Sequence, residues 1–306
     1  MWSRNYLLAR ALRLLVTLWI VATAAFVMMR FSGDPVAAIV GPDPDPNAIE
    51  FVRQKWHLDG PVFEQYETYL LNIVRGDFGV SLASDMPAGE LFLERVPATL
   101  LLGFSSFLLS IAIGMPLGIY AAVKQNTAID RLVMSVSVYA FSMPNFFLGI
   151  LLILLFSLHW HLLPSFGSGS FLSLIMPALT LGLSSAGVIA RFARSSMLDV
   201  LNQPYIRAAR ARGIAHWRRT ILHALPNASI PIVTVLGLRI GDLIAGAIIV
   251  ETVFAWPGVG RLLVDSVEHR DLPVVQVIVL ATAVTMVVAN LTVDLLYGRL
   301  DPRTRR

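Results

Sequence analysis

The sequence predicts an all-α fold: a polytopic membrane protein with six transmembrane helices. Hydrophobic residues make up 56% of the 306 residues and charged residues only 14%, whereas soluble proteins carry about 25% charged residues. Six apolar segments are long enough, or nearly so, to cross about 30 Å of hydrocarbon. Their continuously apolar character favours helices over a membrane barrel, because barrel strands alternate apolar and polar residues.

The first apolar segment, residues 14–29, follows a cluster of arginines. It continues past Ala22-Thr23-Ala24, where a signal peptide would be cleaved, so a retained helix is favoured over a cleaved leader. The strict apolar run is short, and Arg13 and Arg30 are expected to extend toward the interface at its two ends. Residues 1–30 are therefore expected to form the N-terminal cytoplasmic end and the first transmembrane helix.

Residues 31–95 are polar and acidic and are predicted to form an external loop region. Alternating prolines at 41–47 predict an extended stretch. Two short amphipathic helices are expected at 48–58 and 61–74, followed by a turn at Gly76-Asp77-Phe78-Gly79. A D-F-G triplet also marks a magnesium site in protein kinases, but no other kinase motif is present, which favours the turn.

Five more apolar segments follow within residues 96–306, at 97–123, 132–158, 172–190, 231–254 and 273–297. Two of them contain a pair of glycines four residues apart, Gly114 with Gly118 and Gly237 with Gly241. Each pair lies on one helix face, where small residues allow two helix backbones to approach closely. Close helix packing is the favoured explanation for both pairs.

Prolines interrupt three of these segments, at Pro116, Pro144 and Pro177. A proline frees backbone carbonyls that lipid cannot satisfy, so such breaks are tolerated where protein or a cavity satisfies them. Two explanations stay open for these prolines: ordinary packing within the bundle, or the lining of a cavity.

The distribution of charge predicts the orientation of the chain. If the N-terminus is inside, the inner segments hold sixteen basic residues and three acids, and the outer segments hold seven basic residues and fourteen acids. Lys and Arg accumulate on the cytoplasmic side of membrane proteins. Both termini and the loop at 191–230 are therefore predicted to be cytoplasmic.

Residues 205–226, within that loop, hold five arginines and no acid, and we call them the arginine loop. Two short helices joined at Gly213 are predicted, because glycine adopts the positive φ that ends many helices. Asn202 is expected to cap the first helix, with Pro204 in its first turn. Pro226 lacks a backbone N–H and is expected to end the second helix.

The second of these helices carries an apolar stripe, because Ile214, Trp217 and Ile221 lie three and four residues apart. From the residues alone, two functions stay open for the arginine loop. Its charge suits a position near anionic lipid headgroups. Its predicted turn and apolar stripe suit a rigid docking surface for a partner protein.

Four ionisable residues fall inside apolar segments: Arg239, Asp242, Glu251 and Asp294. Glu251 and Asp294 lie near segment ends and are expected to reach the interface. Arg239 and Asp242 are three residues apart in mid-segment, on one helix face, where they are able to pair. A charge at that depth is costly and usually faces a cavity or a partner. Two explanations stay open for them: a self-neutralising structural pair, or part of a solute path.

Motifs for catalysis and for metal or cofactor binding are missing from the sequence. Neither lysine follows a glycine, which excludes the phosphate loop G-x-x-x-x-G-K-[ST], and neither H-E-x-x-H nor G-x-S-x-G occurs. There is no cysteine and so no thiolate metal site. His159 and His161 alternate and do not share a helix face, which argues against a metal site there. We expect no catalytic residue, no metal and no cofactor.

The arginine loop resembles the EAA loop of ABC-importer permeases, in which E-A-A is followed by three residues, a glycine, nine residues and I-x-L-P. The residues that match at this spacing are Ala208, Ala209, Gly213, Leu225 and Pro226. Arg207 stands where the pattern has Glu, and His223 stands where it has Ile. Both departures resemble the dipeptide, oligopeptide and nickel branch of the family, in which Y-I-R-x-A-R-A-x-G is usual.

Further motifs extend the resemblance over nearly the whole chain. They are G-D-P at 33–35, G-D-F-G at 76–79, S-M-P at 142–144, R-S-S-M-L at 194–198, E-T-V-F-A-W-P-G at 251–258, R-D-L-P-V-V-Q at 270–276 and D-L-L-Y at 294–297. Together they make the chain similar to the B-type subunit, the first of the two permeases in such an operon.

The resemblance implies a type I ABC-importer permease fold and a mechanism. In the family, an external solute-binding protein delivers solute to two paired permeases, and two ATPase subunits inside close on ATP and grip the permease loops. For this chain it implies a heterodimer with a second permease in the bacterial cytoplasmic (inner) membrane. It also implies contact with membrane lipid, no nucleic acid partner, and ATP hydrolysis in the partner subunits rather than in this chain.

The resemblance also implies roles for individual residues. The residues that would couple the permease to the ATPase are Arg207, Ala208, Ala209, Gly213, His216, Leu225 and Pro226. A solute path between the two permeases would include Arg239 and Asp242. Permeases similar to this one carry peptides, glutathione or nickel complexes, and the substrate stays open among them.

Two other classes of protein compete with an importer permease. An ion-coupled secondary transporter often shows inverted repeats with broken helices, and the sequence shows no repeat. An intramembrane enzyme would need a nucleophile and a base inside the bundle, which the sequence lacks. Dependence on a separate ATPase distinguishes the importer from both.

Overall fold

The computed structural model describes residues 4–31, 61–81, 83–229, 231–233, 236–237 and 247–300. Every regular element among these residues is a helix, and an isolated antiparallel bridge joins Val80 and Pro87. The predicted all-α fold class is therefore confirmed. The described residues fall into two compact units, one within Met1–Val96 and Leu262–Val287, the other within Pro97–Arg261 and Val288–Arg306.

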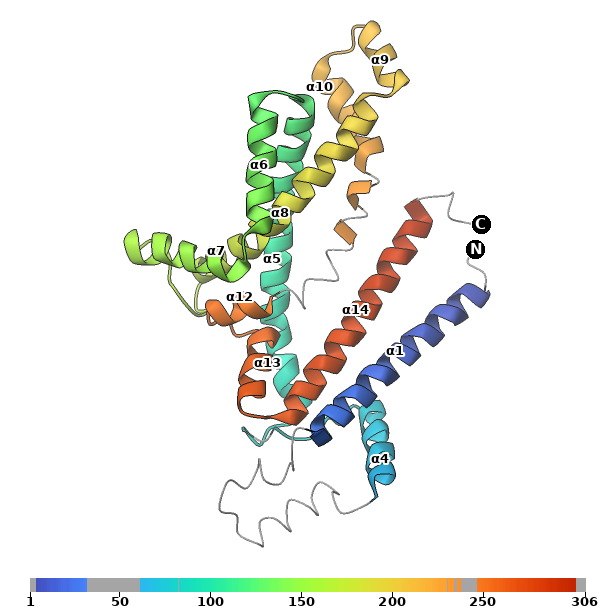
Figure 1. Ribbon diagram of the computed structural model, residues 1–306, viewed down its shortest axis with the longest axis vertical. Helices are drawn as coiled ribbons and strands as arrows, with labels where there is room; N and C mark the ends of the chain where they lie inside the picture. The colour runs from blue at the N-terminus through green and yellow to red at the C-terminus, as the bar shows by residue number, and fades with distance from the viewer. Residues whose placement is uncertain are drawn as a thin grey trace. The chain divides into compact units, whose positions relative to one another are not determined.

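The helices follow one another along the chain as Figure 1 labels them. They are α1 (Arg4–Phe31), α4 (Val62–Arg75), α5 (Ala88–Val123), α6 (Ala128–Ser142), α7 (Asn145–Leu152), the π-helix η1 (Ile153–His159), α8 (Phe171–Leu201), α9 (Pro204–Ala211), α10 (His216–Arg218), the π-helix η2 (Arg219–Ala224), α12 (Ile248–Val253), α13 (Val259–Glu268) and α14 (Leu272–Leu300).

Two described helices, α5 and α8, are long and apolar enough to cross a membrane. The pair formed by α6 and α7–η1 qualifies as a third span if it is counted as one. Shorter apolar stretches, Leu12–Met28 in α1 and Leu272–Val288 in α14, match the first and last predicted segments. Residues 234–235 and 238–246 of the predicted fifth segment, 231–254, lie outside the described residues, so the count of six stays a prediction.

The third predicted segment, residues 132–158, is not one straight helix. The chain bends by 103° between α6 and the helix that begins at Asn145. Met143 is extended, with φ −74° and ψ 126°, because the ring of Pro144 disfavours the α conformation in the residue before it. Pro116 and Pro177, in contrast, lie inside α5 and α8.

Glycines hold α5 against α8 in the second unit. A Cβ built at Gly114 would lie 2.5 Å from the carbonyl oxygen of Ala186, and one at Gly118 would lie 2.8 Å from Cβ of Ala193. The backbones of the two helices are therefore in close contact at these positions, which confirms the packing predicted for Gly114 and Gly118. Gly241, of the second glycine pair, lies outside the described residues.

In the first unit, α4 packs against the C-terminal half of α1. The ring of Phe26 lies 5.2 Å from the rings of both Tyr66 and Tyr69. The Tyr69 hydroxyl donates to the carbonyl oxygen of Ala22, at 3.0 Å, and the hydroxyls of Thr23 and Tyr66 are 2.7 Å apart. These contacts leave the tyrosine face of the amphipathic helix half-buried.

Two other predictions for the external region have different outcomes. The helix predicted at 61–74 is confirmed as α4, and the turn after it is confirmed by positive φ values at Gly76 and Gly79. The helix predicted at 48–58 and the extended stretch at 41–47 lie outside the described residues.

Candidate functional site

The arginine loop folds as two short helices joined at Gly213, as predicted. Gly213 has φ +72°, and its N–H donates to the carbonyl oxygen of Arg210 at 3.0 Å. The next N–H, of Ile214, donates to the carbonyl oxygen of Ala209 at 3.2 Å. Carbonyls at the end of α9 are thereby satisfied before α10 begins. Figure 1 shows α9 and α10 together beyond the end of α8.

The predicted cap of the first helix is wrong. Asn202 has helical dihedral angles and ends α8, where its N–H donates to the carbonyl oxygen of Leu198. An N-cap residue is extended, and Gln203 takes that conformation instead, without a side-chain cap bond. Pro204 occupies the start of α9, as predicted.

The predicted end of the second helix is also wrong. Pro226 does not stop it, because residues 225–229 remain helical. The π-helix η2 precedes this point, and the N–H of Leu225 donates to Thr220, five residues earlier. This wider turn accommodates the proline ring, which clashes with the carbonyl four residues earlier in a regular α-helix.

One side of the arginine loop is anchored to the long helices. Ile206 is buried in a cluster with Ala122 of α5, Met197 of α8 and Ala224 of η2. Leu225 packs against the same cluster and is half-buried. The loop is thus held to the ends of two candidate transmembrane helices by apolar contact.

The other side is exposed and combines apolar with basic groups. Trp217 and Ile221 of the predicted stripe are 56% and 52% exposed and face outward, whereas Ile214 is half-buried. Leu222, next to Ile221, is 58% exposed. The guanidinium of Arg218 lies 5.2 Å from the Trp217 ring centroid. A contiguous exposed apolar surface of this kind is typical of a protein–protein or membrane contact.

Most of the predicted coupling residues lie on this exposed side. Those that are exposed are Arg207, Ala208, Gly213, His216 and Pro226, while Ala209 and Leu225 are half-buried. The arginine loop therefore has an inner side that holds it in place and an outer side that offers charge and apolar area.

The predicted path residues, Arg239 and Asp242, lie outside the described residues. His159 and His161 are exposed, and His159 lies beside Trp160. Among the residues that the structure describes, no group of three or more His, Cys, Asp or Glu side chains is placed to hold a metal ion.

Glu251 differs from its prediction, because its carboxylate is fully buried rather than at the interface. One oxygen accepts from the hydroxyl of Thr99 at 2.7 Å, and the other accepts from the N–H groups of Gly260 at 2.7 Å and Arg261 at 3.1 Å. Thr99 in turn accepts from the N–H of Val259 at 2.8 Å. The carboxylate thus binds the first turn of α13 to α5.

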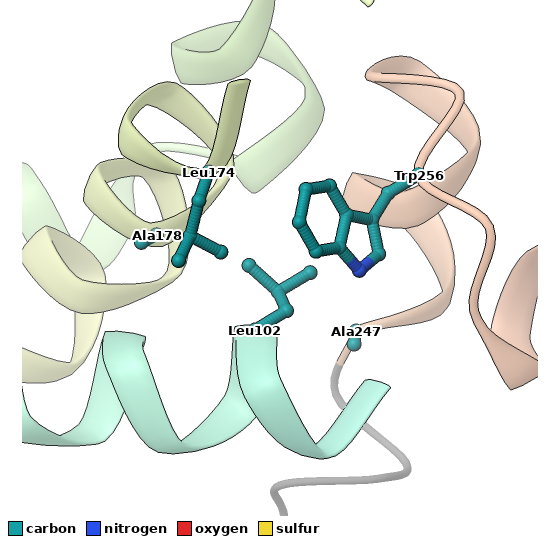
Figure 2. Close-up of a cluster of buried hydrophobic side chains, with 5 residues drawn as sticks. All are labelled: Leu102, Leu174, Ala178, Ala247 and Trp256. Atoms are coloured by element: carbon teal, nitrogen blue, oxygen red, sulfur yellow. The ribbon is translucent and has the colours of Figure 1, made fainter. Parts of the chain in front are cut away.

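Trp256, five residues after Glu251 in the sequence, also connects this segment to α5. The indole N–H of Trp256 donates to the carbonyl oxygen of Ala98 at 2.9 Å. Figure 2 shows its ring against Leu102 of α5, facing Leu174 and Ala178 of α8. The segment E-T-V-F-A-W-P-G therefore joins α12, α13, α5 and α8.

Sequence reasoning also missed an ion pair between Asp130 and Arg194. The available signal was charge, because the predicted inner segments hold sixteen basic residues and three acids, and Asp130 is one of these acids. Its partner lies 64 residues away, which no local pattern reveals.

Two protein-family models match the chain. The one described as the inner membrane component of binding-protein-dependent transport systems matches residues 114–306, and the one for the N-terminal part of such components matches residues 3–103. The glutathione transport system permease protein GsiC of Escherichia coli (strain K12) is 44% identical over 302 residues, which are 98% of this chain and 99% of that protein. GsiC of Shigella dysenteriae serotype 1 matches to the same extent.

Solved structures show a similar fold. A chain of the MetNI methionine ABC transporter in an inward-facing conformation aligns with a TM-score of 0.57 and 20% identity, covering 69% of this chain and 96% of that one. A chain of an amino acid ABC transporter aligns with a TM-score of 0.52, covering 69% of this chain and 94% of that one.

The buried contacts of Glu251 predict a difference between two substitutions. Glu251→Ala leaves the buried Thr99 hydroxyl, the buried N–H of Gly260 and the partly buried N–H of Arg261 without their acceptor. An unsatisfied buried group costs about 1–3 kcal/mol. Glu251→Gln keeps one carbonyl oxygen for the two N–H groups and is expected to be much milder. The melting temperature in detergent measures the difference. Glu268→Ala, at an exposed position of α13, is the control, and equal melting temperatures for it and Glu251→Ala would contradict the assignment.

Proposed function

This chain belongs to the family of inner membrane components of binding-protein-dependent transport systems, and we propose that its arginine loop docks on an ATPase subunit. The chain is a permease subunit of an ABC importer, with membrane-spanning helices. In this proposal it carries out no catalysis, and separate subunits hydrolyse ATP.

The exposed side of the arginine loop supports this docking. Its apolar residues include Trp217, a residue type that often dominates binding energy at interfaces. The surrounding arginines suit an acidic rim on the partner, which would set the orientation of docking. The inner side, held through Ile206 to α5 and α8, would carry a displacement of the loop into the membrane-spanning part.

We propose distinct roles within the loop. Arg207, Ala208, Gly213 and His216 contact the ATPase subunit directly, together with Pro226. Ala209 and Leu225, which are half-buried, hold these residues against the supporting cluster. A loop that only touched anionic lipid would not need the fixed turn at Gly213.

The proposed assembly pairs this chain with a different second permease, two ATPase subunits and an external solute-binding protein. An ion-coupled secondary transporter would work without the ATPase subunits, and an intramembrane enzyme would need no such assembly. Uptake that requires ATP hydrolysis by the co-purified subunits distinguishes the importer from both.

The proposed substrate class is a short peptide or a related small solute. The relative at 44% identity is named for glutathione transport, and glutathione is a tripeptide. A nickel complex is the alternative within the family. Because the external binding protein selects the solute in such systems, a screen of that protein against glutathione, dipeptides, oligopeptides and nickel complexes tests the assignment.

The turn at Gly213 predicts how two substitutions there differ. No atom lies within 4 Å of a Cβ built at Gly213, so a new side chain meets only the backbone cost of φ +72°. That cost is about 1–2 kcal/mol for an ordinary L residue, which corresponds to about a 5- to 30-fold change in an equilibrium. Gly213→Val is expected to lower ATPase binding by about this factor.

Gly213→Asn is the matched control, because asparagine adopts positive φ more readily than valine. The measurement is binding of the ATPase subunit to the purified permease pair, together with solute-stimulated hydrolysis. If Gly213→Val binds the ATPase as tightly as Gly213→Asn, the coupling role of the turn is wrong.

The orientation is proposed from charge, with both termini and residues 191–230 cytoplasmic and residues 31–95 external. The chain contains no cysteine, so single-cysteine reporters give a clean signal. Ser84→Cys is expected to react with an impermeant thiol reagent in intact spheroplasts, whereas Gln125→Cys is expected to react only after permeabilisation. Both positions are exposed. The reverse labelling pattern would overturn the orientation.

We also propose that Arg239 and Asp242 contribute to the solute path. If Asp242 contacts a cationic group of the solute, Asp242→Asn should lower uptake while the complex still assembles. If the two residues only neutralise each other, Asp242→Asn leaves the charge of Arg239 unpaired in mid-membrane, which costs about 2.5–3.5 kcal/mol. The amount of assembled complex then falls instead. Replacing both residues by neutral ones discriminates between the two, and recovered uptake in that double variant excludes the path.

A further inference from the structure

An ion pair with two hydrogen bonds joins the first turn of α6 to α8. Nε of Arg194 lies 2.5 Å from Oδ1 of Asp130, and a terminal guanidinium nitrogen of Arg194 lies 2.7 Å from Oδ2. Asp130 is 3% exposed. A bidentate pair of this kind fixes the relative orientation of its two side chains as well as their distance.

The same carboxylate orders the turn between α5 and α6. Oδ2 of Asp130 also accepts from the N–H of Asn126 at 2.9 Å, where Asn126 has φ +64°. Thr127 caps α6 and donates its hydroxyl hydrogen to the carbonyl oxygen of Lys124 at 2.6 Å. Asp130 therefore links three parts of the chain: the turn after α5, the start of α6, and α8.

Arg194 lies on the part of α8 that supports the arginine loop. Met197, three residues later and so about one helical turn further, is buried against Ile206. Ala122 of α5 is in the same cluster and directly precedes the turn that Asp130 orders. The arginine loop, α8, Asp130 and the end of α5 thus form a closed ring of contacts.

Beyond this ring, α6 leads to the bend at Pro144 and then to α7. A Cβ built at Gly149 of α7 would lie 3.1 Å from the ring of Phe254, which follows α12. Leu152 and Ile153 pack against the cluster that contains Val250 and Phe254. Packed side chains therefore connect α7, which follows α6 after the bend, to α12.

We propose that the Asp130–Arg194 pair makes α6 move together with α8 when the arginine loop is displaced, so that both are positioning residues for transport. This inference rests on the proposed docking of the arginine loop on an ATPase subunit. Further along, α6 packs closely on α8, where a Cβ built at Gly187 would meet the carbonyl oxygen of Ser137. Without the pair, the start of α6 and the turn before it would therefore lag behind α8 when the loop is displaced. ATP hydrolysis would then continue with less solute moved per ATP.

The test measures solute uptake and ATP hydrolysis in proteoliposomes that hold the full complex with its external binding protein. Asp130→Asn keeps the side-chain shape and removes the charge. We expect hydrolysis to be retained and the ratio of uptake to ATP hydrolysed to fall by about fivefold or more, the lower end of typical coupling between sites. Asp199→Asn, which makes the same change at an exposed position of α8, is the matched control and should leave the ratio unchanged.

A purely structural role gives a different result. In that case the amount of complex falls, uptake and hydrolysis per complex stay in proportion, and the proposal is overturned. If Asp130→Asn does not assemble, Arg194→Lys is measured in the same way, because it keeps the positive charge and loses only the two-bond geometry. If Arg194→Lys has the same ratio of uptake to ATP hydrolysed as Asp199→Asn, the proposal is also overturned.

A covalent replacement for the pair tests the mechanical part directly. The double variant Asp130→Cys with Arg194→Cys, joined by a short bifunctional thiol reagent, restores a connection without charge. We expect the joined protein to recover the ratio that the unjoined protein has lost, and no recovery counts against the proposal. ATPase binding by Gly213→Val that is as tight as that by Gly213→Asn would refute the proposed function, whereas normal docking with an unchanged ratio in Asp130→Asn would refute only this inference.

Discussion

Close backbone contact between α5 and α8 is the constraint on which the rest of the second unit depends. Lipid chains are as apolar as leucine, so apolar area alone does not drive helices together in a membrane, and small residues that permit close approach take that role. Gly114 and Gly118 supply this approach on α5, opposite Ala186 and Ala193. Because the helices are held here, their ends are near enough for Ala122 and Met197 to form one platform for Ile206. The arginine loop is positioned by contacts between the helices that begin inside the predicted membrane segments, at Gly114 and Ala186.

Polar groups make the connections that apolar contact leaves undefined. Glu251 and Asp130 are both buried carboxylates, and each accepts from one residue distant in the sequence, Thr99 or Arg194, and from nearby backbone N–H groups. A buried acceptor of this kind selects one arrangement of its donors, since any other arrangement leaves polar groups unsatisfied. Glu251 fixes the segment that follows α12, and Asp130 fixes the turn that precedes α6. The apolar bundle sets which helices are neighbours, and these carboxylates set their register.

Local rules predicted much of the fold and of the arginine loop. The helix at α4, the turn at Gly213 and the packing of Gly114 and Gly118 follow from periodicity, backbone preference and side-chain size. The burial of Glu251 does not follow from local rules, because a position near a segment end predicts that the side chain reaches the membrane interface. Its partner Thr99 lies 152 residues away in the sequence. Prolines were equally ambiguous: Pro144 marks a bend of 103°, while Pro177 lies within a continuous α8. Tertiary contacts decide between these outcomes, and a local pattern does not contain them.

The π-helix η2 has a consequence for how related chains are compared. A π-turn accommodates one residue more than an α-turn over the same rise, and one residue corresponds to about 100° of rotation around a helix. Trp217 precedes η2 and faces outward, whereas Ala228 follows it and is buried. A homologue with a one-residue deletion between 219 and 224 would present a different set of side chains at one of these two surfaces. Insertions and deletions in this hexapeptide therefore change which side chains the arginine loop exposes, even where every flanking residue is identical.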